Sequence, residues 1–314
     1  MQSGTEGSFS GRYRSVSDEM KSVFGTKVYK IALSAGCTCP NRDGTLDSRG
    51  CLFCSSGGSG EFASDQTRSI LDQIEQGKSK VSAKIRDGKY IAYFQAYSNT
   101  YGSVERLEKL FFEAAEHPDI VAVSIATRPD CFPEEILDLL SRLNLVNPVW
   151  IELGLQTIHP QTSELIRSGF DLLCFEEAVQ KLAARGIQVI THLILGLPGE
   201  TREMMLESVE YLGRQTAVSG IKLSMLHVLK NTDLADMYER KEFTLMSKED
   251  YLKIICECIK RLPNRMVIHR LTGDGPKSLL IAPLWTSDKR GMINDIRRVF
   301  SRENVVQGEL FRPL

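Results

Sequence analysis

Four of the eight cysteines in this chain of 314 residues lie within one short segment and carry the clearest chemical signal in the sequence. They are Cys37, Cys39, Cys51 and Cys54. Thiolates are soft ligands, so a group of them selects zinc, copper(I) or an iron–sulfur cluster. The segment follows an apolar, strand-like run over residues 28–34. Since parallel α/β folds bind ligands at the carboxyl ends of their strands, we expect a metal centre at that edge of a sheet.

The spacing of these cysteines is compatible with two kinds of metal centre. Two close pairs, Cys37 with Cys39 and Cys51 with Cys54, would supply the ligands of a tetrahedral zinc ion. An iron–sulfur cluster that leaves one iron free for another ligand needs fewer thiolates, and Cys51, Cys54 and one upstream cysteine suffice. The cysteines alone leave both centres open.

Strand-like and helical patterns alternate along the chain. Apolar runs of strand length occur at residues 28–34, 90–97, 120–127, 149–156, 188–196 and 220–228. Amphipathic helical patterns lie between and after them, at about 69–86, 103–117, 133–143, 175–185, 201–215 and 248–261. This alternation predicts a parallel sheet with right-handed crossovers and helices over both faces. Periodicity does not choose between an open doubly wound sheet and a partial barrel.

Composition and charge restrict the class of protein. Hydrophobic residues make up 42% of the chain, and the net charge of −1 gives no global attraction to nucleic acid or to an acidic membrane. No apolar run approaches the roughly 18 residues that indicate a transmembrane helix. The polar N-terminus lacks the apolar core of a secretion signal. We therefore expect a cytoplasmic protein without membrane contact, in which clustered cysteines favour metal binding over disulfides.

Three segments are expected along the chain. Residues 1–20 are predicted to be a disordered lead-in and residues 21–264 to form the α/β domain. Residues 265–314 are predicted to be a C-terminal extension that packs on the barrel or closes it, with a possible seventh strand at its start and a helix at 292–301. From Lys260 onward 11 Lys/Arg stand against 5 Asp/Glu, a balance of +6 that indicates either a solvated surface or contact with phosphates.

Further motifs stand at the ends of the predicted strands. They are Thr38–Thr45 (TCPNRDGT), Gly50–Cys54 (GCLFC), Tyr93–Tyr97 (YFQAY), Ala126–Asp130 (ATRPD), Glu152–Gln156 (ELGLQ) and His192–Glu200 (HLILGLPGE). In this order they resemble the radical S-adenosylmethionine (radical SAM) superfamily, in particular the branch shared by the catalytic subunit of Elongator and the YtqA/YhcC-like group. For the YtqA/YhcC-like group the resemblance covers nearly the whole chain. It implies a partial (β/α)6 TIM-type barrel, the radical SAM core.

The resemblance also implies the cofactors. A 4Fe-4S cluster would be held by Cys39, Cys51 and Cys54, in the spacing Cys-x11-Cys-x2-Cys, whose long first gap is typical of the Elongator-like branch. Cys37 is then a bystander thiol, or it replaces Cys39 as a ligand. A reductant such as flavodoxin or ferredoxin would supply the electron that cleaves S-adenosylmethionine (SAM), and the resulting radical would abstract hydrogen from the substrate.

Residues at the strand ends are predicted from the same resemblance to bind SAM. They are Gln95, Gln156, Arg167, His192, Leu195 and Gly196.

The resemblance assigns each of these residues to a part of SAM. Gln95 is assigned to the SAM amino group, although it departs from the Gly-Gly-Glu-like motif that many members have there. Gln156 and His192 are assigned to the ribose, and Arg167 to the carboxylate, which a guanidinium matches with two hydrogen bonds. Leu195 and Gly196 would present backbone groups to the adenine. The alternatives are a polar core position for Gln95, a surface helix end for Arg167 and a core histidine for His192.

Strand alternation places two more polar side chains near the mouth of the barrel. Arg128 and Glu152 are expected to point there, or to anchor a neighbouring loop. No role in the reaction follows for either from the sequence.

These observations predict a radical SAM enzyme that forms a monomer or a weak dimer. The resemblance suggests a tRNA substrate and the modification of a wobble uridine, and the basic C-terminal segment is compatible with phosphate contacts. A small molecule or a peptide is the alternative substrate. A zinc-stapled binding protein is the alternative outside enzymes.

Overall fold

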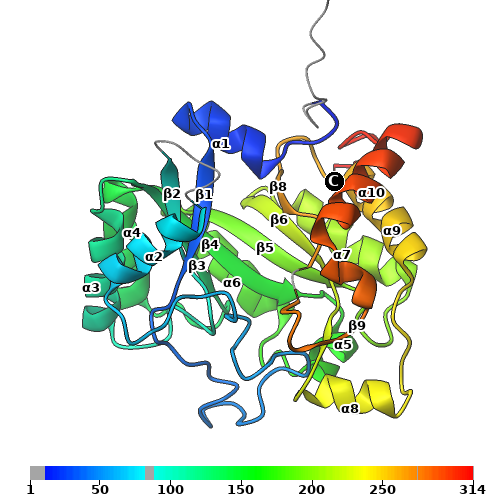
Figure 1. Ribbon diagram of the computed structural model, residues 1–314, viewed down its shortest axis with the longest axis horizontal. Helices are drawn as coiled ribbons and strands as arrows, with labels where there is room; N and C mark the ends of the chain where they lie inside the picture. The colour runs from blue at the N-terminus through cyan, green and yellow to red at the C-terminus, as the bar shows by residue number, and fades with distance from the viewer. Residues whose placement is uncertain (1–10, 82–87, 274, 314) are drawn as a thin grey trace, which may run out of the picture.

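The computed structural model describes residues 11–81, 88–273 and 275–313, and its centre is a curled sheet of seven parallel strands (Figure 1). Every pairing in this sheet is parallel. From one edge to the other the strands are β1 (Val28–Leu33), β2 (Lys89–Phe94), β3 (Ile120–Thr127), β4 (Val149–Gln156), β5 (Gln188–Leu195), β6 (Val218–Met225) and β8 (Val267–Arg270). The predicted partial barrel is confirmed, and β8 is its seventh strand.

Helices cover the outer face of the curled sheet (Figure 1). They are α2 (Ile70–Val81), α3 (Val104–Ala115), α4 (Glu134–Val146), α6 (Leu172–Ala183), α7 (Arg202–Arg214) and α9 (Lys248–Arg261). Side chains that accept a hydrogen bond from the first turn fix the starts of several: Ser103 for α3, Asp171 for α6, Thr201 for α7 and Ser247 for α9. Part of the first predicted helix, residues 82–86, lies outside the described residues.

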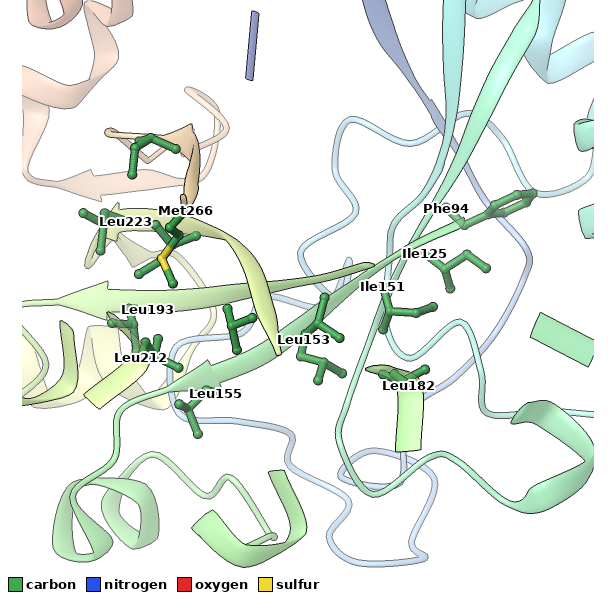
Figure 2. Packing of buried hydrophobic residues seen from close by; sticks show 14 of the residues in the cluster. Phe94, Ile125, Ile151, Leu153, Leu155, Leu182, Leu193, Leu212, Leu223 and Met266 are labelled. Atoms are coloured by element: carbon green, nitrogen blue, oxygen red, sulfur yellow. The ribbon is translucent and has the colours of Figure 1, made fainter. Parts of the chain in front are cut away.

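The main hydrophobic core lies between the outer face of the sheet and these helices. Figure 2 shows strand residues such as Ile125, Ile151 and Leu193 in one buried cluster with Leu182 of α6 and Leu212 of α7. The strands read as nearly continuous apolar runs because this face and much of the inner face are both buried. The core therefore holds the strands in register, and their carboxyl ends meet at one edge of the sheet.

The inner face of the barrel begins with an apolar layer at the amino ends of the strands. Ile91, Ala122, Trp150 and Ile190 form it, and Met20 of helix α1 (Val16–Phe24) packs against them. Alternate residues of a strand point to the same face, so the next inward position along each strand lies one layer higher. Helix α1 thus closes the lower end of the barrel.

The N-terminal segment is shorter than predicted as a lead-in. Residues 1–10 lie outside the described residues, but residues 16–20 belong to α1, so the prediction of disorder up to residue 20 is wrong there. The helix forms because Ser15 caps its first turn and Gly25 ends it in a left-handed conformation. Ser15 also makes a parallel bridge to Ile268, which ties this segment to β8.

The C-terminal segment is built into the barrel and also extends beyond it. Strand β8 completes the parallel sheet, whereas β9 (Leu280–Ala282) pairs with β7 (Val228–Leu229) in a separate antiparallel ribbon. A short 3-10 helix, η2 (Leu284–Ser287), leads into α10 (Lys289–Arg302), which contains the helix expected at 292–301. Helices α5 (Pro160–Leu165) and α8 (Asp233–Glu239) follow β4 and β7 near the carboxyl edge. In the described ranges no helix has both the length and the apolar character needed to span a bilayer.

Gln307 fastens the two ends of the chain to the barrel. Its Nε2 donates to the carbonyls of Pro263 and Met266 at 2.7 and 2.8 Å, and its Oε1 accepts from the Arg14 amide at 2.8 Å. The side chain is buried, so the partners that lose it would have no water to replace it.

Replacing Gln307 should therefore cost stability. We expect Gln307→Ala to lower the free energy of unfolding by about 2–4 kcal/mol, because two buried carbonyls and one part-buried amide lose their partner. Chemical denaturation measures this change. Val306→Ala is the matched control, since Val306 is 40% exposed and its truncation should change stability by about 0.5 kcal/mol or less. Equal effects of the two substitutions would contradict the role given to Gln307.

Candidate functional site

The long connection between β1 and α2 brings three of the clustered thiols to one cavity. Cys39, Cys51 and Cys54 all line it, at the carboxyl edge of the sheet, and with its open mouth it measures about 900 Å³. Cys37 does not line this cavity. Its thiol is buried in the hydrophobic core, 3.4 Å from a guanidinium nitrogen of Arg106. The geometry thus separates Cys37 from the three cysteines of the predicted ligand set.

The electrostatics of the cavity disfavour free thiolates at Cys51 and Cys54. Burial raises the pKa of the Cys51 thiol to about 11, and the neighbouring Cys54 adds to the shift. Burial likewise raises the pKa of Cys54, while the guanidinium of Arg42 opposes it. A cationic metal centre would reverse this balance, because it binds the thiolate form and releases the protons.

The thiol spacing bears on which metal centre fits. In the described part of the chain, no three His, Cys, Asp or Glu side chains converge closely enough to hold a single metal ion. A tetrahedral zinc would require such convergence. A 4Fe-4S cluster takes each thiolate to a different iron, so its ligands stand further apart. Cys39, Cys51 and Cys54 around one cavity supply the three thiolates that a cluster with one free iron requires.

Hydrogen bonds to two neighbouring segments fix the shape of the cysteine loop. The Asn41 side-chain amide donates to the Arg167 carbonyl at 2.7 Å and lies 3.3 Å from the Cys51 sulfur. The Leu52 amide donates to the Ile166 carbonyl, and the Leu52 carbonyl accepts from the backbone of α8. The loop is thus held between the end of α5 and the start of α8.

The upper wall of the cavity carries polar atoms that lack partners. Gln95 Nε2, Ser98 Oγ and Ser168 Oγ line the cavity, are buried, and make no hydrogen bond with the described residues. Leaving such groups unpaired costs about 1–3 kcal/mol each, so a polar ligand at this place would be stabilised by them. These atoms fit a ligand with amino, carboxylate and hydroxyl groups.

The same wall contains strained backbone. Ala96 and Tyr97 follow β2 with φ angles of +82° and +59°, and Gln156 ends β4 at +71°. Left-handed conformations are unfavourable for residues with a Cβ and concentrate at binding and catalytic sites. Two glycines let the cysteine loop approach this strained turn, since a Cβ on Gly58 would lie 2.3 Å from the Tyr97 ring and one on Gly60 2.2 Å from Ala96.

The structure brings together half of the residues predicted to contact SAM. Gln95, Gln156 and His192 line the cavity with the cysteines. Arg167 lies outside the lining, and its guanidinium donates to Asp233 at 2.6 Å. The cavity instead contains the guanidinium of Arg128, which is paired with Asp130.

Leu195 and Gly196 also lie outside the lining of this cavity. Leu195 is buried in the main core. The Gly196 amide donates to the Met205 sulfur at 3.1 Å, and Gly196 borders a neighbouring hollow at the start of α7. The φ of +85° at Gly196 is the reason a glycine stands at this strand end.

A charged layer forms the floor of the cavity. Glu152 of β4 is 1% exposed, and its carboxylate accepts from four side chains on four other strands. The donors are Lys30 of β1, Ser124 of β3, His192 of β5 and Lys222 of β6. We call Glu152 and these four donors, with Tyr93 of β2, the charged floor.

Cations hold the Glu152 carboxylate ionised. Burial alone would raise the pKa of Glu152, but Lys222, Lys30 and His192 hold it well below its usual range. Burial lowers the pKa of Lys222 to about 7, although Glu152 opposes the shift. Burial and the charge of Lys222 lower the pKa of His192 to about 4, so the imidazole is neutral near pH 7.

Sequence reasoning placed Glu152 near the barrel mouth but did not find Lys30, Lys222 or Tyr93. A signal was present for the lysines, since each interrupts a buried apolar strand, and a lysine is almost never fully buried unless it is paired. What the sequence does not show is that the two lysines meet the same carboxylate from opposite sides of the curled sheet.

The low pKa of Lys222 makes stability depend on pH. Between about pH 7 and 10.4 the unfolded chain binds more protons at this lysine than the native chain, so the free energy of unfolding should rise with pH, by up to about 1.4 kcal/mol per pH unit. Denaturation at several pH values should show this slope in the wild type and lose it in Lys222→Met. Lys253→Met, at a side chain 75% exposed, should keep it. An unchanged slope in Lys222→Met would contradict the prediction.

Known proteins are similar to this chain in sequence and in fold. The chain is 42% identical over 303 residues to the uncharacterized protein YtqA of Bacillus subtilis. The aligned region covers 96% of this chain and 94% of that protein. It is 25% identical over 234 residues to a tRNA uridine(34) acetyltransferase of Methanocaldococcus jannaschii, covering 69% of this chain and 42% of that protein. A solved structure of Elp3 from Methanocaldococcus infernus matches with a TM-score of 0.68 and 17% identity, covering 89% of this chain and 64% of that one, which shows a shared fold.

Two family profiles match consecutive parts of the chain. The radical SAM C-terminal domain matches residues 218–302, a range that begins with β6. The radical SAM superfamily matches residues 39–212, which include the three cavity cysteines and most of the charged floor. The chain therefore belongs to the radical SAM superfamily of enzymes.

Proposed function

We propose that this radical SAM enzyme holds a 4Fe-4S cluster through Cys39, Cys51 and Cys54, binds SAM in the adjoining cavity and acts on tRNA. The observation that carries the cofactor part is the convergence, in one cavity, of these thiols with the unpaired polar atoms of Gln95 and Ser98. When bound, the two cofactors supply reductive cleavage of SAM and hydrogen-atom abstraction from the substrate.

The residues of the chain would prepare the site for this chemistry. The cysteine loop supplies three thiolates, and the Asn41 amide beside Cys51 contributes a hydrogen-bond donor near one sulfur. Gln95, Ser98 and Ser168 supply polar groups that a bound SAM would satisfy. The closed apolar layer under the barrel and helix α1 exclude water from below, which limits side reactions of a reactive intermediate.

The remaining SAM contacts stay predictions with different structural support. Gln156 and His192 reach the cavity from β4 and β5. Arg167 would have to release Asp233 before it could pair with a carboxylate of SAM. Leu195 and Gly196 would need to act from the neighbouring hollow.

The tRNA substrate is supported by the similarity to the tRNA uridine(34) acetyltransferase. Only 42% of that relative aligns, so acetyl transfer is not part of the proposal. A second support is the basic surface of α10, where Lys289, Arg290, Arg297, Arg298 and Arg302 are exposed. Removing this helix would not test the contact, because its Met292, Ile296 and Phe300 belong to the core.

The cofactor proposal predicts a sharp difference between the clustered cysteines. Cys39→Ser, Cys51→Ser and Cys54→Ser should each lose most of the iron after anaerobic reconstitution, because each removes one of three thiolate ligands. Cys37→Ser should retain about four irons per chain, since its thiol faces Arg106 in the core. Iron and sulfide analysis measures the content. Loss of the cluster in Cys37→Ser but not in Cys39→Ser would assign the third ligand to Cys37.

The substrate proposal predicts salt-dependent binding of tRNA. We expect the reconstituted protein, with flavodoxin or ferredoxin as reductant, to form 5′-deoxyadenosine from SAM. Bulk tRNA from a strain that lacks the gene should bind it in a salt-sensitive way and acquire a modified uridine. Replacing Arg290, Arg298 and Arg302 together by Gln should weaken binding by about tenfold or more and flatten the salt dependence. Lys253→Gln, on α9, is the control. SAM cleavage with indifference to tRNA would refute the substrate and keep the cofactors.

A further inference from the structure

The charged floor is not needed to hold the cluster or to close the barrel. It lies on the inner face of six strands, beneath the cysteines and above the apolar layer of Trp150. Keeping the Glu152 carboxylate and the Lys222 ammonium out of water carries a desolvation cost, and replacing such a pair by apolar residues is often neutral or stabilising. The presence of this charged group at the floor of the cavity therefore points to a role in function.

Within this floor, Glu152 has no capacity left for a ligand. One oxygen accepts from Lys30 and from Ser124 at 2.8 Å, and the other accepts from Lys222 and from His192 Nε2 at 2.9 Å. An ionised carboxylate has about four acceptor positions, and all are used. Although Glu152 borders the cavity, its role is to orient its neighbours.

His192 is the neighbour that this arrangement leaves with an open position. Since Glu152 is ionised and accepts from Nε2, the imidazole carries its proton on Nε2, and Nδ1 is an acceptor. Nδ1 makes no hydrogen bond with the described residues and is not sealed from solvent. His192 lines the cavity, and its side chain is 25% exposed. It therefore presents a neutral acceptor to whatever occupies the lower cavity.

Charges on every strand around His192 keep this state fixed. Lys222 and Arg270 face it from β6 and β8, and oppose a second proton on the ring. Tyr93, on β2, has a pKa raised well above its usual range by burial and by Glu152, so it remains a neutral phenol. His269 of β8 is also neutral, since burial and Lys30 lower its pKa. Glu152 is the one carboxylate named among these groups, and it contacts Nε2 only.

We propose that His192 Nδ1 accepts a hydrogen bond from an N–H or O–H group of the substrate, and that Glu152 is the positioning residue that fixes this tautomer. The proposal rests on the proposed function, because it places the substrate below the cofactors in the same cavity. It names a substrate class: a polar molecule that presents an N–H or O–H donor to the lower cavity. The imide N–H of a uracil ring is such a donor.

An acceptor of this kind sets specificity. A substrate analogue without the donor leaves Nδ1 buried and unpaired, and sites built around such hydrogen bonds reject analogues by about 10⁴–10⁵-fold. His192 is then a substrate-binding residue and not a contact of the SAM ribose, the role predicted for it from the sequence.

Two substitutions at His192 separate the acceptor from the contact with Glu152. In His192→Gln the side-chain amide can still donate to Glu152, but no acceptor remains at the Nδ1 position. In His192→Asn an oxygen can stand near the Nδ1 position, but the side chain no longer reaches Glu152. If the acceptor matters most, we expect the Asn variant to retain more substrate conversion than the Gln variant.

The first readout needs neither cofactor turnover nor a known substrate. Nitrogen NMR of histidine-labelled protein, with the signal assigned through His192→Gln, should show a neutral Nε2–H imidazole from pH 5.5 to 8, well above the pKa of about 4. Lys222→Met should raise the pKa of His192, because a repelling cation is lost, and Glu152→Gln should mix the two tautomers. A neutral Nδ1–H form in the wild type, or a protonated ring, would overturn the proposal.

The second and third readouts use the reconstituted holoenzyme. His192→Gln should bind SAM within about threefold of the wild type, as measured by calorimetry, and should still form 5′-deoxyadenosine. It should convert a uridine-34 anticodon stem-loop at least 100-fold more slowly, and the wild type should reject the N3-methyluridine stem-loop to a similar extent. A tenfold weaker affinity for SAM would make His192 a cofactor contact and overturn the proposal, as would unchanged conversion.

These readouts also separate the inference from the proposed function. A wild type that cleaves SAM but ignores both stem-loops refutes the tRNA substrate, and the inference is then decided by the tautomer and by the SAM affinity of His192→Gln. A wild type that binds no cluster refutes the proposed function, whatever the NMR result shows.

Discussion

One buried carboxylate organises the inner face of this barrel. Glu152 accepts hydrogen bonds from side chains of β1, β3, β5 and β6, so a single group links strands that are not neighbours in the sheet. Two lysines attached to one carboxylate are stable out of water only when each charge meets a partner. The curl of the sheet meets this condition, because it directs the inward-facing side chains of distant strands toward the same point. The cavity floor therefore lies where these inward-facing side chains meet.

The half barrel also has an open side that the chain must close. Strands β1 and β8 are the edges of the sheet and do not pair with each other. The N-terminal segment lies along β8, where Ser15 bridges Ile268, and α1 closes the lower end. Gln307 then ties this segment to the loop before β8. The described residues near the two ends of the chain thus belong to the structural support of the site, although none of them lines the cavity.

The order of elements and the place of the cysteines were predictable from the sequence for physical reasons. Apolar runs of strand length that alternate with helical patterns favour buried parallel strands, and the cysteines follow the first run directly. Helical patterns in the sequence also located α9 and most of α10. Helix α1 was missed because the segment from Arg12 to Ser17 is mostly polar and the helix depends on a cap and on packing of Met20 under the barrel.

The site was less predictable than the fold, since contacts across the barrel depend on the curl and register of the sheet. Strand alternation indicated that Glu152 faces inward, but no local pattern pairs it with Lys30, more than a hundred residues earlier in the chain. Arg167 illustrates another limit, because it was assigned to the SAM carboxylate on the resemblance and on the match between a guanidinium and a carboxylate. The structure provides that partner within the protein, in Asp233 of α8.

The polar groups at the upper level of the cavity lack hydrogen-bond partners, whereas most of those at the lower level have them. Upper groups such as Gln95 Nε2 and Ser98 Oγ lack partners, and the backbone beside them at Ala96 and Tyr97 is strained. In the lower level Glu152 is saturated, and the open acceptor is on His192. A ligand that binds the upper level gains several new hydrogen bonds, so binding there depends on supplying many polar groups. A ligand in the lower level meets a rigid wall with one acceptor, so selection there depends on one donor in the right place. The same barrel can therefore hold a common cofactor by many contacts and still be selective for its substrate by few.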